Sequence, residues 1–152
     1  MCDPAIKHKL LDTCKFFIQQ RITTATMAMN DAQLSANEEG KSSAGDKYET
    51  GRAMMQIERD QAAYQLEEAL KLKRILDQIN PAIHHTEISL GCVVITSVFK
   101  VYVAIGAGKT TVDGEDFLII ALHSPLGKVL SGLKINEQFT FNNQLNTIIE
   151  IL

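Results

Sequence analysis

Residues 66–81 read LEEALKLKRILDQINP, and a helical pattern ends within this stretch. A repeat of seven positions runs through this stretch and the residues before it: Tyr48, Met55, Ala62, Ala69 and Leu76. A repeat of seven is typical of a helix packed in a coiled coil. Proline does not continue a helix, and after Asn80-Pro81 the composition changes to β-branched residues with regularly placed turns. We therefore expect a helical half, residues 1–80, and a β-rich half, residues 81–152.

A second long helix is predicted ahead of the first pattern. Its apolar stripe has a spacing of three or four residues: Leu11, Cys14, Ile18, Ile22, Ala25, Met29, Ala32 and Ala36. Bulky residues, Phe16 and Phe17 among them, stand at the start of this helix and at the end of the next, and small residues and methionines lie between. An antiparallel hairpin matches this distribution, with its tip near residues 38–47 and each helix about 50 Å long.

The β-rich half predicts short strands and one helix. The expected strands are Ser89–Thr96, Val98–Ile105, Asp116–Leu122, Gln138–Phe141 and Leu145–Ile151. Turns are expected at Gly106–Gly108, Asp113-Gly114 and Asn142-Asn143. The helix has Ser124 as its cap, Pro125 in its first turn and Gly132 at its end. The expected fold is α+β, with a small antiparallel sheet packed on one short helix.

The charge and cysteine content limit the class of partner and the compartment. The net charge is −3, and neither half is basic, which argues against direct DNA binding through a basic surface. Three scattered cysteines are poor material for a disulfide framework and suit a reducing compartment. No apolar leader and no run long enough to span a bilayer is evident. We expect a cytoplasmic protein with a protein partner and no membrane contact.

Two groups of short motifs resemble the Gre transcript-cleavage factors. One is Ser124-Pro125-Leu126-Gly127-Lys128-Val129-Leu130-Ser131-Gly132, followed by Asn136-Glu137-Gln138-Phe139 and the closing strand Thr147–Ile151. The other is Tyr48-Glu49-Thr50-Gly51-Arg52, which keeps the tyrosine and arginine that follow the Gre tip. The resemblance spans nearly the whole chain through short motifs.

The resemblance implies a role at bacterial RNA polymerase. Gre-like proteins place an FKBP-like C-terminal domain on the rim of the polymerase secondary channel, and their coiled coil enters that channel. In members that cleave, two tip carboxylates help to hold a second Mg²⁺ that activates water. The implied docking residues here are Ser124, Pro125, Gly127 and Lys128.

The tip of this chain departs from the Gre pattern. Aligned on Tyr48, the family's Gly-Asp-x-x-Glu-Asn-x-x-Tyr has Lys41 in place of its aspartate and Ala44 in place of its glutamate. The tip candidates for metal or RNA contact are Glu38, Glu39, Asp46, Glu49 and Arg52. The alternative, which we favour, is that Asp46 and Glu49 cap the second helix and that the other two acids are solvated. Arg52, Lys41 and Lys47 have two interpretations of equal weight. Their positive charges contact an RNA phosphate, or they are ordinary solvent-exposed charges of the helices.

We therefore expect a regulator of transcription elongation that binds RNA polymerase. Any contact with nascent RNA would be made inside the polymerase channel. The expected cofactor is none, apart from Mg²⁺ shared with the polymerase. It would not itself be an enzyme, because the polymerase would carry out any cleavage. One alternative is a coiled-coil interaction module unrelated to transcription. A less favoured one is an FKBP-like prolyl isomerase, since the β-rich half has few aromatic residues and no tryptophan.

Three other patterns are interpreted as structural. Gly106-Ala107-Gly108-Lys109-Thr110-Thr111 resembles a P-loop but lacks its first glycine, so we expect a hairpin turn. His84, His85, His123 and Cys92 lack the spacing of a zinc site. Cys14 and Cys92 lie in apolar patterns, with nothing nearby to lower a thiol pKa.

Overall fold

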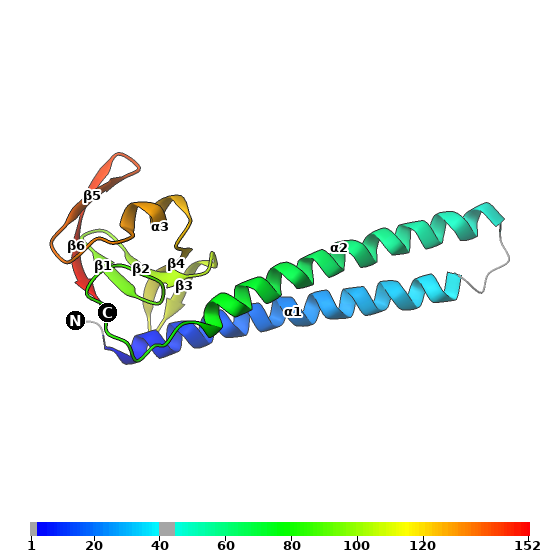
Figure 1. The fold of residues 1–152 in the computed structure, drawn as a ribbon, viewed down its shortest axis with the longest axis horizontal. Coiled ribbons are helices and arrows are strands. Elements are labelled where there is room, and N and C mark those ends of the chain that lie inside the picture. The colour runs from blue at the N-terminus through cyan, green and yellow to red at the C-terminus, as the bar shows by residue number, and fades with distance from the viewer. Residues whose placement is uncertain (1–2, 40–44) are drawn as a thin grey trace. The chain divides into compact units, whose positions relative to one another are not determined.

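The computed structural model describes residues 3–39 and 45–152, and its fold is α+β (Figure 1). Two long helices are followed by six strands and one short helix. The elements are α1 Ala5–Glu39, α2 Gly45–Asp77, β1 Val93–Thr96, β2 Lys100–Ala104, β3 Gly108–Val112, β4 Glu115–Ala121, α3 Pro125–Leu130, β5 Gln138–Phe141 and β6 Gln144–Ile151. Within the described residues, neither long helix has a stretch apolar enough to cross a lipid bilayer.

The chain forms two compact units. One joins Met1–Lys15 to Arg74–Leu152, and the other is Phe16–Lys73. The first unit therefore groups the start of α1 and the end of α2 with the sheet.

In the unit Phe16–Lys73, the helices meet through small residues. Among the described side chains of this unit, those that are buried are Ile18, Ala25, Ala32, Ala36, Ala62 and Ala69. These positions belong to the two predicted stripes, which are thereby confirmed where the structure describes them. Alanine at the contact lets two helix backbones approach closely, because no long side chain separates them.

Phe16 and Phe17 do not pack at the base of the hairpin as predicted. Their side chains are 65% and 40% exposed. Each residue advances an α-helix by about 100°, so residues one and two positions before the buried Ile18 point away from its face. Size alone suggested a core role for both phenylalanines, and helical phase decides otherwise.

The six strands form a mixed sheet in the order β3-β4-β2-β1-β6-β5. Four neighbouring pairs are antiparallel, and β2 pairs with β4 in parallel, from Val101–Leu118 to Ala104–Ala121. The expected sheet was antiparallel throughout and lacked β3. The chain reverses direction between β2 and β3 and again between β3 and β4, so β4 runs in the direction of β2.

The predicted hairpin turns are confirmed by backbone geometry. Asp113 and Gly114 have φ values of 53° and 77°, and Asn142 and Asn143 have φ values of 52° and 60°. Two consecutive residues with positive φ are the mark of a type I′ turn, whose twist suits antiparallel strands. These turns join β3 to β4 and β5 to β6.

Both faces of the sheet are covered within its own unit. On one face a core forms beneath α3, and it includes Val101, Val103, Leu126 and Leu130. Tyr102 points to the opposite face because side chains alternate along a strand, and it is fully buried there. The start of α1 belongs to the same unit as the sheet, and Leu10, Leu11 and Cys14 are buried there.

Candidate functional site

The helix α3 begins where the Ser-Pro motif predicts. The Ser124 Oγ accepts a hydrogen bond from the Gly127 backbone N at 3.1 Å and donates one to the Ala121 carbonyl at 2.7 Å. Pro125 occupies the first turn, where a missing N–H leaves no helical hydrogen bond unmade. The motif thus fixes the start of α3 against the end of β4.

At Gly127, α3 lies so close to the chain that follows β4 that there is no room for a side chain. A Cβ atom at this position would come within 2.3 Å of the Ala121 carbonyl oxygen and 2.5 Å of the Leu122 carbonyl oxygen. Both obstacles are backbone atoms, which cannot move aside as a flexible side chain would. Gly127 is therefore required for close packing.

The four predicted docking residues lie together in this one helical segment and divide into two pairs. Ser124 and Gly127 build the helix, whereas Pro125 and Lys128 are exposed. Val129, beside Lys128, is an exposed apolar residue of the same helix that sequence analysis did not select. Because α3 has two buried leucines to set its phase, the exposure of Val129 could have been inferred from their spacing.

The hairpin end is only partly described. The side chains of Glu38, Glu39 and Asp46 lie outside the described residues. Glu49 and Arg52 are exposed, and their spacing of three residues places them on one face of α2. A shared metal site among the tip acids thus stays a prediction.

A cavity of about 430 Å³ that the sequence did not predict lies beside β2, β3 and β4. Its lining has an apolar part with Phe99 and Phe117, and charged residues in two ion pairs. Lys100 pairs with Glu115 at 3.0 Å, and Lys109 pairs with Asp116 at 3.1 Å.

These ion pairs limit the chemistry of the cavity. A hydrogen bond from the Thr111 hydroxyl, followed by the hydrogen bond and charge of Lys109, lowers the pKa of Asp116. A carboxylate held in its ionised form is a poor general acid near neutral pH. The cavity presents apolar surface beside ion-paired charges, a lining that suits a bound group of mixed polarity.

The remaining chemistry-bearing residues occupy structural positions. Burial raises the pKa of Cys14 to about 12. Burial also raises the pKa of Cys92 to about 11, although a backbone hydrogen bond at Ser89 and the charge of Lys7 lower it in part, contrary to the expectation that nothing nearby would do so. His85 Nδ1 and Ser89 Oγ are 2.9 Å apart, within hydrogen-bonding distance. Gly108–Val112 forms strand β3 where a P-loop would need a helix, so the segment is not a P-loop. The hairpin turn expected at these residues is wrong, because β4 lies between β2 and β3 and the two strands do not pair. Over residues 3–39 and 45–152, no three His, Cys, Asp or Glu side chains group as metal ligands.

No protein-family model and no curated protein matches this sequence. Among solved structures, the chain is similar to the transcription factor Gfh1, with 17% identity over 88% of this chain and 90% of that chain and a TM-score of 0.34. A TM-score of this size does not establish a shared fold.

Proposed function

We propose that this chain binds bacterial RNA polymerase at its secondary channel and regulates transcription elongation. The supporting features are the resemblance of its short motifs to Gre factors and the way those motifs fold. The observation that carries the proposal is the construction of α3. Ser124 and Gly127 hold this helix on the sheet, and Pro125 and Lys128 are left exposed to meet a partner.

The unit Phe16–Lys73 has properties that suit entry into a narrow channel. Its two helices pack through alanines, so the pair is thin. From Phe16 to Glu39, α1 extends for about 35 Å at a rise of ~1.5 Å per residue. A slender pair of helices can carry acidic or basic residues to a site that a globular domain cannot enter.

We propose further that regulation occurs without stimulation of RNA cleavage. Lys41 and Ala44 stand where cleaving Gre factors have acidic residues. A second Mg²⁺ needs hard oxygen ligands, which lysine and alanine do not supply. Occupation of the channel, or modulation of pausing, would then be the mode of action.

Affinity capture with purified core RNA polymerase tests the docking proposal. The wild-type chain is expected to bind, and Lys128→Glu is expected to weaken binding by about tenfold, because it reverses an exposed charge on α3. Lys134→Glu is the matched control, since Lys134 is also exposed but lies outside α3. A folded wild-type chain that does not bind at micromolar concentration would overturn the proposal and leave the unrelated coiled-coil module as the better interpretation.

Stalled, backtracked polymerase complexes test the absence of cleavage. We expect no RNA shortening beyond the intrinsic activity of the polymerase. Shortening that disappears in both Asp46→Ala and Glu49→Ala would contradict this and would identify these acids as metal ligands. Circular dichroism of both variants is needed alongside, because both residues lie in the first two turns of α2, where a carboxylate also stabilises the helix.

A further inference from the structure

The helix α1 carries a second heptad stripe that does not face α2. Its members are spaced alternately by three and four residues: Phe17, Gln20, Thr24, Met27, Asp31 and Leu34. We call these six residues the α1 outer stripe. All six are exposed, and Met27 and Leu34 are 59% and 61% exposed. The alternation of three and four residues is the pattern of a coiled-coil seam.

The outer stripe is distinct from the stripe that contacts α2. The buried stripe includes Ile18, Ala25 and Ala32, and each member of the outer stripe is turned by about 100° or more from the one of these residues nearest to it in sequence. Phe17, Met27 and Leu34 are the large apolar members of the stripe, and exposed apolar residues gathered along one helix face mark an interaction surface more often than single exposed residues do.

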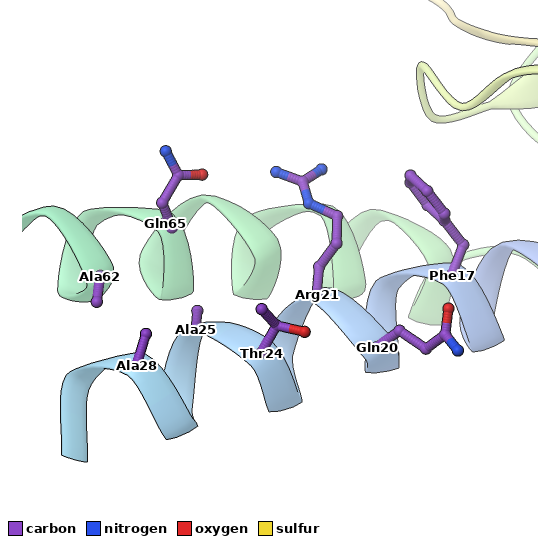
Figure 2. A pocket seen from close by; sticks show the side chains of 8 residues that line it. All are labelled: Phe17, Gln20, Arg21, Thr24, Ala25, Ala28, Ala62 and Gln65. Carbon is purple, nitrogen blue, oxygen red and sulfur yellow. The ribbon is translucent and has the colours of Figure 1, made fainter. Parts of the chain in front are cut away.

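A groove on one flank of the outer stripe can receive side chains of a partner. Its volume is about 330 Å³, and Phe17, Gln20 and Thr24 of the stripe line it. Figure 2 shows Phe17 and Arg21 projecting to the same side of α1, with Ala25 and Ala28 of α1 and Ala62 of α2 directed between the helices. The alanines leave this space open. A second hollow of about 470 Å³, lined by Phe16, Gln19, Gln20, Thr23 and Thr24, flanks the stripe on the other side.

We propose that the outer stripe binds the same stripe of a second copy of this chain, with the two α1 helices antiparallel about a twofold axis. In this pairing Phe17 faces the partner's Leu34, and Thr24 faces the partner's Met27. Gln20 faces the partner's Asp31. The symmetry repeats each contact, so every large apolar member of the stripe is covered.

The charges of this helix segment favour the antiparallel arrangement. Between residues 16 and 37 the only charged residues are Arg21 and Asp31. The proposed pairing brings Arg21 beside the partner's Asp31 twice, once on each side of the axis. A parallel pairing would instead place Arg21 against the partner's Arg21 and Asp31 against the partner's Asp31, which is repulsive.

The expected dimer is weak because one helix face is small. The stripe from Phe17 to Leu34 spans about 27 Å at ~1.5 Å per residue. A contact of this length buries less than the roughly 800 Å² per partner of a standard interface. We expect a dissociation constant on the order of tens of micromolar.

Sedimentation velocity of the full chain over a concentration series tests the proposal. The wild type is expected to pass from monomer to dimer across the micromolar range. Leu34→Gln should weaken the dimer by about tenfold or more, through loss of its contact with the partner's Phe17. Ile57→Gln is the matched control, since Ile57 is 57% exposed on α2, and it should leave dimerisation unchanged.

A charge exchange tests the orientation of the two helices. Asp31→Arg should weaken the dimer by about tenfold, and the double variant Arg21→Asp/Asp31→Arg should restore it. If Asp31→Arg weakened the dimer only by disturbing the helix, adding Arg21→Asp would not restore dimerisation. Asp60→Arg, a reversal at an exposed position of α2, serves as the charge control.

A wild-type chain that stays monomeric at every concentration would overturn the proposal. So would a dimer that is insensitive to both Leu34→Gln and Asp31→Arg, or a double variant that stays as weak as Asp31→Arg. Circular dichroism confirms that each variant is helical. No polymerase enters these measurements, so their failure leaves the proposed function untouched.

Discussion

At the scale of single residues, Gly127 is the position where one methyl group matters most. Gly127→Ala is expected to lower the free energy of unfolding by about 2–4 kcal/mol, because the new Cβ would overlap two backbone carbonyl oxygens. Urea denaturation followed by circular dichroism measures this change. Gly106→Ala is the control, since its Cβ would meet nothing within 4 Å and should alter stability by less than about 1 kcal/mol. Equal effects of the two substitutions would show that packing at α3 is not the cause.

Cys14 predicts a dependence of stability on alkaline pH. Burial raises its pKa from 9.0 to about 12, so the folded chain keeps the thiol proton that the unfolded chain loses above pH 9. The stabilising contribution of this thiol is therefore fully present below pH 9 and is lost as pH rises toward 12. Relative to Cys14→Ala, the wild type should lose about 1 kcal/mol per pH unit in that range.

This comparison removes the contribution of Lys7 and leaves those of Cys14 and of its smaller effect on Tyr102. Burial lowers the pKa of Lys7, which acts in the opposite direction, but it does so in both proteins. Denaturant melts at pH 8, 9, 10 and 11 give the difference directly. A constant difference between the wild type and Cys14→Ala across this series would contradict the raised thiol pKa.

At the scale of secondary-structure elements, the alanines of α1 and α2 set how closely the helices pack. Ala69 is completely buried in this contact. Ala69→Leu should lower the free energy of unfolding by about 1–3 kcal/mol, because three more carbon atoms must fit between two helices. The matched control is Ala53→Leu on the exposed surface of α2, where the side chain has room. If Ala69→Leu leaves stability unchanged, the two helices cannot be as close as the alanine contact requires.

At the scale of the whole molecule, the two compact units differ in how much large apolar surface they bury. Among the described residues, the largest fully buried side chains include Tyr102, Phe117 and Leu10 of the sheet-containing unit, and Ile18 alone from Phe16–Lys73. Burial of large apolar groups is the main source of local stability. Amides of residues 22–39 and 45–66 should therefore exchange with solvent at opening free energies at least about 2 kcal/mol below those of β1, β2 and β6. Hydrogen exchange with mass spectrometry measures both regions in one sample, and uniform protection would refute the expected difference.

Local chemistry in the sequence was sufficient to predict most elements. The stripes of α1 and α2, the Ser-Pro start of α3 and the Asp-Gly and Asn-Asn turns follow from helical period, capping and positive φ. Each depends on residues a few positions apart. The α+β class and the position of α3 could be predicted for this reason, whereas the docking role of α3 comes from the resemblance to Gre factors and stays a prediction.

Only the tertiary structure decided how these elements combine. The position of β4 between β2 and β3 makes the sheet mixed, and no residue near β4 signals it. The division of the α3 residues into Ser124 and Gly127, which build the helix, and Pro125 and Lys128, which are exposed, depends on carbonyl groups of the preceding segment. The exposure of Phe17 depends on which face of α1 meets α2. Backbone preferences and turn chemistry act between neighbours in the chain, whereas strand order and burial depend on contacts between distant segments, and these exist only once the chain has folded.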